Sequence, residues 1–139
     1  LNNMTWTFTK RIYGYECDIY GHLNNANYLQ LLEAARSEAL YKMNLAQSDL
    51  QEKGVQLLVH KVEMNYIKAI DHDEIVTVKS RFVEINRIKG IWIQEIFNAQ
   101  EEKCFEANLT IVFASKGKAK RLPVEVYELF LPYIEEKQD

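Results

Sequence analysis

The chain has 139 residues, of which 47% are hydrophobic, and this length and composition predict one domain, residues 1–139, with enough apolar material for a core. Its formal net charge of −3 argues against a nucleic-acid-binding protein, which needs a broad cationic face. Because the sequence contains neither an apolar run of about 18 residues nor a signal-peptide pattern at its start, we expect a soluble, cytoplasmic protein without a membrane partner.

The first predicted element is a strand from Trp6 to Ile12, where apolar residues alternate with Thr and Lys. A segment rich in potential chemistry follows at residues 18–29, with an acid, a glycine turn, a histidine and two amides. This segment leads directly into a helix predicted from about Asn24 to Met43, where apolar residues recur at three- and four-residue steps. The acid should therefore lie close to unpaired N–H groups and the positive end of a helix dipole.

A short helix is predicted next, with Ser48 to Gln51 as its capping box and Gly54 as its end. Four strands are then expected at about 55–70, 74–87, 91–101 and 104–115. Turns are expected at residues 71–73, 89–90 and 101–103, and Val124 to Ile134 is predicted as a C-terminal helix after Pro123. One strand, a long helix and four strands with short links predict an α+β domain whose antiparallel sheet buries one face on the helix.

Two interpretations of Asp18 follow from the residues themselves. Asp-x-x-Gly is common turn chemistry, so Asp18 could cap the turn that precedes Gly21. A carboxylate beside a helix N-terminus could equally act on a carbonyl group, because the N–H groups there can stabilise an oxyanion. His22 could be an exposed loop residue or could orient water, and Asn24 and Asn25 are both suited to capping the helix.

Asp18, Gly21, His22, Asn24, Asn25, Tyr28 and Leu29 fall on the pattern D-x-x-G-H-x-N-N-x-x-Y-L. This segment resembles that of the hotdog-fold acyl-CoA thioesterases, the 4-hydroxybenzoyl-CoA thioesterase-like superfamily. The resemblance extends over most of the chain, since residues 62–69 and 73–78 look like the second strand and the start of the third strand of that family. It implies a hotdog fold, in which a five-stranded antiparallel sheet wraps around one long helix.

The resemblance implies a thioester hydrolase that converts an acyl-CoA to a carboxylic acid and CoA, and it assigns catalytic roles to Asp18, His22, Asn24 and Asn25. Asp18 would act as nucleophile or as general base, and both routes are chemically sensible. The N–H near Asn25 would face the thioester oxygen, while His22 would support the reaction. Cys17 is the poorer nucleophile candidate, since adjacent residues of an extended segment point to opposite sides.

Tyr28 and Leu32 could line an acyl pocket, although core packing explains them equally well. Arg87 and Lys89 are candidates for binding the phosphates of CoA, with the basic run at 116–121 as a second possibility; a solvated surface is the simpler reading of both. Glu33 and Arg36 are expected to form a surface ion pair. We find no metal-ligand spacing and expect neither a metal nor an organic cofactor.

Two alternatives stay open. An acyl-ACP thioesterase shares the fold and much of the motif, although the plant-type enzymes commonly have asparagine two residues after the aspartate, where this chain has Tyr20. A non-catalytic acyl-CoA-binding domain is the other alternative, and the presence of Asp18 argues against it. We expect a homodimer or a homotetramer, because a symmetric partner can cover the open sheet edges and an apolar flank.

Overall fold

The computed structural model describes residues 4–134. Five long strands form one antiparallel sheet in the order β1-β3-β4-β5-β2, and the short strand β6 pairs only with the end of β5. The strands are β1 (Thr5–Arg11), β2 (Gln56–Tyr66), β3 (Ile75–Ile85), β4 (Lys89–Phe97), β5 (Lys103–Ser115) and β6 (Lys118–Ala119). The predicted α+β class and the five-stranded antiparallel sheet are therefore confirmed, with β6 as a two-residue addition.

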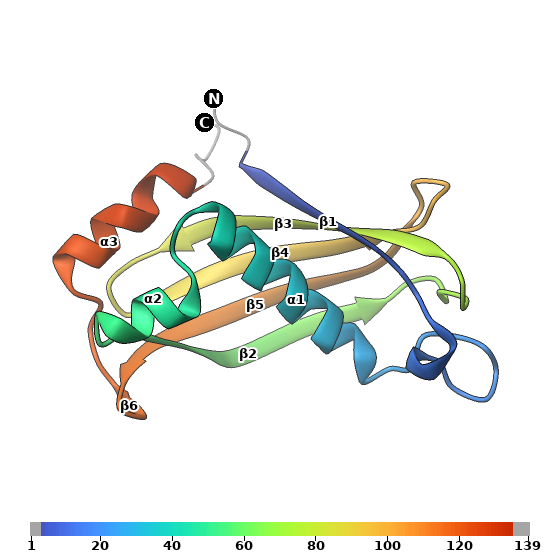
Figure 1. Ribbon diagram of the computed structural model, residues 1–139, viewed down its shortest axis with the longest axis horizontal. Coiled ribbons are helices and arrows are strands. Elements are labelled where there is room, and N and C mark those ends of the chain that lie inside the picture. Colours follow the sequence, from blue (N-terminus) through green and yellow to red (C-terminus); the bar gives the residue numbers. More distant parts are fainter. Residues whose placement is uncertain (1–3, 135–139) are drawn as a thin grey trace.

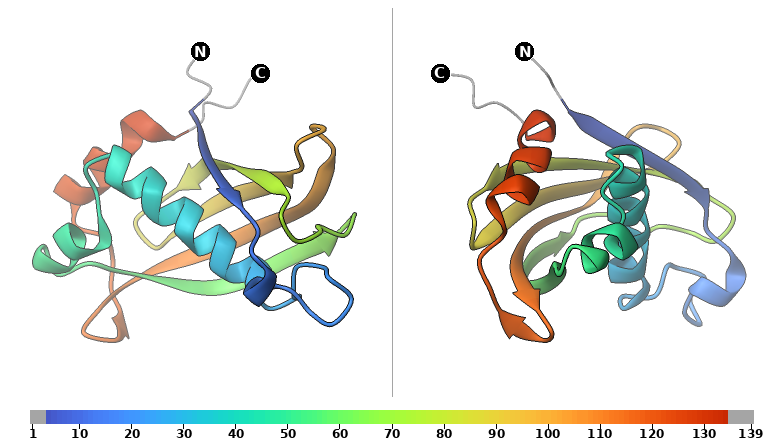
Figure 2. Two further views of the ribbon diagram at one scale, coloured as in Figure 1. Left: turned by 45° about the vertical axis from the view of Figure 1, so that its right-hand side comes forward. Right: turned by 60° about the vertical axis from the view of Figure 1, so that its left-hand side comes forward.

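The long helix α1 (Asn27–Lys42) lies across one face of the sheet, which curls around it (Figures 1 and 2). The helix contains neither glycine nor proline, and it ends before Asn44, which adopts the left-handed conformation at φ 59°. Its buried face consists of Tyr28, Leu31, Leu32, Ala35, Arg36, Ala39 and Leu40. This wrapped arrangement is the predicted hotdog fold.

The helices α2 (Gln47–Glu52) and α3 (Val124–Phe130) lie at one end of the sheet (Figure 1). Phe130 of α3 is fully buried and contacts Phe82, which packs in turn on Trp92 with ring centroids 4.7 Å apart. Gly90 is required beside this cluster, because a Cβ there would lie 2.7 Å from the ring of Phe82. Among the described residues, no helix is both long enough and apolar enough to cross a membrane.

Three local predictions were wrong. Ser48 does not cap α2, because the helix already begins at Gln47 and its N-cap residue is Ala46. The turn expected at 89–90 lies earlier, since the Asn86 side chain accepts the N–H groups of Ile88 and Lys89 and β4 begins at Lys89. The predicted C-terminal helix ends at Phe130 and continues as the 3-10 turn η2 (Leu131–Tyr133), because Pro132 interrupts the α-helical pattern.

Arg36 also differs from the prediction, since it does not form a surface pair with Glu33. Its side chain is buried beneath α1 and donates a hydrogen bond from Nη1 to Oε1 of Gln94, at 2.9 Å. Gln94 is itself fully buried and donates to the Leu32 carbonyl and to the Ser80 hydroxyl. Burial lowers the pKa of the Arg36 guanidinium. The buried face of α1 therefore includes a polar contact with the centre of the sheet.

Candidate active site

The loop between β1 and α1 carries the chemistry-bearing motif. It begins with the 3-10 turn η1 (Gly14–Glu16) and closes through an isolated antiparallel bridge between Cys17 and Leu23. Gly21 has φ +79°, and a Cβ at this position would also lie 3.3 Å from the ring of His72. The positive φ therefore favours glycine at this point, and a larger residue would also push against the exposed ring of His72.

Asp18 lies inside this loop and organises it. Its Oδ1 accepts hydrogen bonds from the backbone N–H groups of Tyr20, at 2.9 Å, and His22, at 3.2 Å. Its backbone N–H donates to the His22 carbonyl, and its carbonyl accepts the Gly21 N–H. The structural role that the Asp-x-x-Gly spacing predicts is therefore present. The other carboxylate oxygen, Oδ2, accepts no hydrogen bond from the described residues, so Oδ1 alone holds the loop.

His22 is partly exposed, and its Nε2 lies 3.3 Å from Oδ1 of Asp71. An isolated bridge pairs the same two residues through the backbone, and the His72 N–H donates to the Gly21 carbonyl at 3.0 Å. The loop between β2 and β3 therefore holds the imidazole at the edge of the site. The sequence does not indicate this role of Asp71, because the pairing joins two loops that are far apart along the chain.

Asn24 and Asn25 precede α1 and have different surroundings. The Asn24 side chain accepts the N–H of Ala26 at 3.0 Å in the turn before the helix. The predicted capping role is wrong, because the N-cap residue of α1 is Ala26 and no side chain caps the helix. The Asn25 carbonyl accepts a hydrogen bond from the Tyr66 hydroxyl, also at 3.0 Å. The Asn25 N–H has no hydrogen-bond partner within residues 4–134. This unpaired donor lies two residues before the start of α1.

A pocket of about 210 Å³ joins these groups. Tyr28 lies against its wall at 3% exposure and packs on Tyr66 and Phe105, with ring centroids 4.9 and 4.7 Å away. Burial raises the pKa of Tyr28 to about 12, so its hydroxyl keeps its proton at neutral pH. The lining residues are Asp18, His22, Leu23, Asn25, Tyr28, Tyr66, Ile67, Lys68 and Ala69.

Cys17 lies beside Asp18 in sequence but does not line this pocket. Its Sγ lies 3.5 Å from the Tyr13 carbonyl, and burial together with the charges of Glu16 and Asp18 raises the pKa of the thiol. A raised pKa disfavours the thiolate, which is the nucleophilic form of cysteine. Asp18 is therefore the better candidate for the reacting group.

Three predicted substrate-binding residues lie away from the pocket. Leu32 lies on the buried face of α1 and is fully enclosed in the core, in agreement with the core-packing interpretation. Arg87 and Lys89 lie at the opposite end of the sheet, where Lys89 pairs with Val112 of β5 and Val112 pairs in turn with Leu58 near the start of β2. The eight residue steps of β2 from Leu58 to Tyr66, at about 3.3 Å each, separate that end from the Asp18 pocket by roughly 26 Å.

The two basic runs of the sequence come together at this far end. Arg87 donates from Nε to the Leu122 carbonyl at 2.8 Å and accepts the Leu122 N–H at its own carbonyl. The backbone N–H of Lys120 donates to the Phe113 carbonyl, and the Phe113 N–H donates to the Ile88 carbonyl. We call this cluster the basic end, and it consists of Arg87, Lys89, Lys116, Lys118, Lys120 and Arg121. The convergence depends on pairing around β5 and was not predicted.

Comparison with known proteins places the chain among thioesterases. Residues 14–130 match the model of the thioesterase-like superfamily. The long-chain acyl-CoA thioesterase FadM of Escherichia coli K12 is 28% identical over 83% of this chain and 87% of its own length. The acyl-CoA thioester hydrolase YbgC of Escherichia coli O6:H1 is 24% identical over 94% of this chain and 98% of its own.

Solved structures agree on the fold. The DHNA-CoA thioesterase of Staphylococcus aureus superposes with a TM-score of 0.85 and 22% sequence identity, covering 92% of this chain and 89% of that one.

Proposed function

The chain belongs to the thioesterase-like superfamily, and on this premise we propose that it hydrolyses an acyl-CoA thioester to a carboxylic acid and CoA. One observation carries the proposal: the free oxygen of Asp18 and the unpaired N–H of Asn25 belong to residues that line the same pocket. A carboxylate and an oxyanion donor around one space are what the hydrolysis of a thioester requires. The names of the relatives supply the substrate class.

The reaction breaks the bond between the acyl carbon and the sulfur of CoA. In one route Asp18 attacks the acyl carbon, CoA leaves as the thiolate, and water then hydrolyses the mixed anhydride. In the other route Asp18 takes a proton from a water molecule, which attacks the thioester directly. In both routes negative charge develops on the thioester oxygen, where the Asn25 N–H and the positive end of α1 stabilise it.

His22→Ala should lower kcat on the order of tenfold, which corresponds to a barrier increase of about 1.4 kcal/mol. This loss should be smaller than the loss expected for Asp18→Asn, because His22 pairs with Asp71 and orients groups at the edge of the pocket. Asp71→Asn, which keeps the shape of the partner, should cause a smaller loss still in the same assay. A loss for His22→Ala as large as that for Asp18→Asn would instead give His22 the main chemical role.

We also propose that two copies associate through β2. This strand lies at the edge of the sheet, and four apolar side chains on it are 37–49% exposed: Leu58, Val59, Met64 and Tyr66. An edge of this length with apolar side chains favours symmetric pairing with a second copy. The Asp18 pocket, at about 210 Å³, also lies below the roughly 300 Å³ at which ligand pockets usually begin, which supports a site completed by a partner.

Antiparallel pairing of two β2 strands brings the Gln56 end of each strand beside the Tyr66 end of the other. The basic end of one subunit then lies near the Asp18 pocket of its partner, although the two lie far apart within one subunit. We propose that Arg87 and Lys89 bind the CoA phosphates in this way across the interface.

Arg87→Ala/Lys89→Ala should raise KM for acyl-CoA and leave kcat largely unchanged, because phosphate binding is shared by the ground state and the transition state. Added salt should raise the wild-type KM more steeply than that of the double variant. Lys42→Glu, which changes the net charge equally at an exposed position of α1, should leave both unchanged. An unaltered KM and salt response would direct the test to Lys116, Lys118 and Lys120.

An assay of free-thiol release over a panel of acyl-CoA and acyl-ACP substrates tests the proposed function. We expect turnover of acyl-CoA substrates above turnover of the matching acyl-ACP substrates, because the basic end offers charges for the CoA phosphates. Preference for the carrier protein would favour the acyl-ACP alternative. Equilibrium binding without thiol release would favour a non-catalytic acyl-CoA-binding domain.

A further inference from the structure

Tyr28 carries a buried hydroxyl group without a hydrogen-bond partner. Only 3% of this residue is exposed, and its hydroxyl makes no hydrogen bond with any of residues 4–134. Buried polar groups are almost always paired, because an unpaired donor costs free energy. The neighbouring Tyr66 follows this rule, since its hydroxyl donates to the Asn25 carbonyl at 3.0 Å. The unpaired hydroxyl of Tyr28 is therefore an exception within the same pocket.

This hydroxyl opens onto the pocket that Asp18 lines. Within the described part of the chain, Trp6 Nε1 is the only buried side-chain polar atom that is both sealed from solvent and unpaired, so the Tyr28 oxygen is accessible. Tyr28 lines the Asp18 pocket, which is the space that its hydroxyl faces. Burial raises the pKa of Tyr28 to about 12, and the charge of Asp18 acts in the same direction. The hydroxyl therefore keeps its proton and can donate it in a hydrogen bond.

Packing fixes the ring that carries this donor. The Tyr28 centroid lies 4.9 Å from that of Tyr66, with the two rings at 82°, and 4.7 Å from that of Phe105. Tyr28 is also the second residue of α1, three positions after Asn25, so both donors belong to the start of the helix. A donor that is held in place before the substrate binds needs no reorganisation in the transition state.

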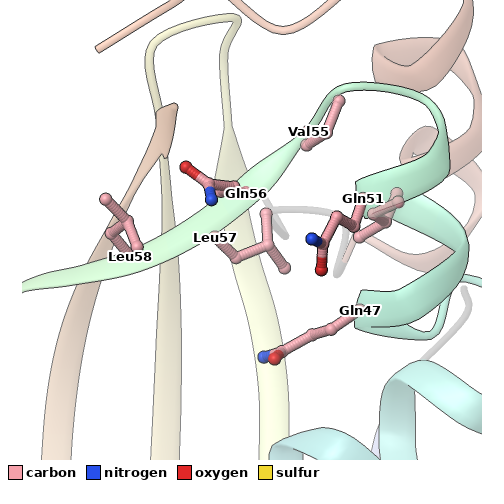
Figure 3. A pocket seen from close by; sticks show the side chains of 7 residues that line it. Gln47, Gln51, Val55, Gln56, Leu57 and Leu58 are labelled. Atoms are coloured by element: carbon pink, nitrogen blue, oxygen red, sulfur yellow. The ribbon is translucent and has the colours of Figure 1, made fainter. Parts of the chain in front are cut away.

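The pocket between α2 and the start of β2 provides a comparison (Figure 3). It has a volume of about 180 Å³ and is lined by glutamine and aliphatic side chains (Figure 3). Its described lining residues include neither a carboxylate nor a hydroxyl group: Gln47, Leu50, Gln51, Val55, Gln56, Leu57 and Leu58. Of these two pockets, only that of Asp18 combines a carboxylate with an unpaired hydroxyl donor.

We propose that Tyr28 is a further catalytic residue, whose hydroxyl donates a hydrogen bond to the thioester oxygen beside the Asn25 N–H. This inference rests on the proposed function. When Asp18 or a water molecule adds to the acyl carbon, the π electron pair of the carbonyl moves to the oxygen, and the two donors stabilise the charge. That pair then re-forms the carbonyl as the C–S bond breaks, and CoA leaves as the thiolate. Tyr28 donates only a hydrogen bond and keeps its proton throughout.

Tyr28→Phe should lower kcat for acyl-CoA hydrolysis about 10²- to 10³-fold, the range found when one oxyanion donor is removed. KM should change little, because the hydrogen bond strengthens mainly in the transition state. Tyr41→Phe removes a hydroxyl from a position of α1 that is 61% exposed, and it should match wild type in both constants. A normal kcat for Tyr28→Phe, with or without a raised KM, would overturn the proposal.

Thermal unfolding separates a catalytic role from a structural one. Tyr28→Phe removes an unpaired polar group from a buried position, so its melting temperature should equal or exceed that of wild type. Tyr66→Phe breaks the hydrogen bond to the Asn25 carbonyl and should lower the melting temperature. A lowered melting temperature for Tyr28→Phe as well would show that its hydroxyl stabilises the fold, against the role proposed here.

Infrared spectroscopy of a bound thioester tests the contact itself. Asp18→Asn should hold acyl-CoA intact, and isotopic labelling of the acyl carbon identifies the carbonyl band. Because a hydrogen bond weakens the carbonyl bond, Asp18→Asn/Tyr28→Phe should show this band at higher frequency than Asp18→Asn, whereas Asp18→Asn/Tyr41→Phe should not. An equal frequency in the first pair would overturn the proposal. If the band shifts but wild-type protein releases no thiol, the proposed function fails and the Tyr28 contact stands.

Discussion

Asp18→Asn should lower kcat for acyl-CoA hydrolysis by about 10²- to 10⁴-fold, the range usually found when a general base is removed. The amide keeps the size of the side chain but cannot attack the thioester or accept a proton from water. KM should change little, because no binding contact to CoA is lost. Steady-state release of free thiol by the purified variant measures the effect.

The same substitution should leave the fold intact. The asparagine oxygen can still accept the N–H groups of Tyr20 and His22 that hold the loop, so we expect the free energy of unfolding to fall by no more than about 1 kcal/mol. Glu38→Gln, a matched loss of an exposed carboxylate on α1, should leave kcat unchanged. Near-normal activity of Asp18→Asn would remove Asp18 from the chemistry.

Val59→Lys/Met64→Lys should produce a monomer that has lost nearly all activity. Both side chains are already partly exposed in the isolated subunit, at 49% and 37%, so the subunit should tolerate the charges. In a β2–β2 interface the same charges would be buried without partners, which costs several kcal/mol and weakens association by about 10²-fold or more. Light scattering at micromolar concentration, together with thiol release, measures both effects.

The control for the interface variant is Leu129→Lys, which places a charge on an equally exposed apolar position of α3, away from β2. It should behave as wild type in both measurements. A lysine variant of β2 that is monomeric and fully active would contradict a site shared between subunits. A wild-type protein that is monomeric under the same conditions would contradict the proposed association itself.

The fold was largely predictable because its signals are local. Alternation marks the strands, and the spacing of Tyr28, Leu32, Ala35 and Ala39 marks α1, whose buried face includes all four. The contiguous motif brings Asp18, His22 and Asn25 to one pocket, since the last lies only seven positions after the first. Short-range sequence therefore defines the centre of the site.

The remaining features depend on contacts that the sequence does not reveal. Arg36 was placed on the surface because charged residues are usually exposed, but Gln94, 58 positions away, provides its buried partner. The pairing of His22 with Asp71 joins two loops, and the basic end forms only when β4, β5 and the segment after β6 come together. The start of β4 was misplaced because the Asn86 side chain, rather than Gly90, forms the turn.

A single-turnover experiment tests Asp18-dependent hydrolysis most directly. Wild-type protein in excess over radiolabelled acyl-CoA should convert the bound ester completely to free acid and CoA in equal amounts. Asp18→Asn should bind the same ester with an unchanged Kd and return it intact over the same time. Intact ester recovered from the wild-type complex, or equal conversion by both proteins, would contradict the account.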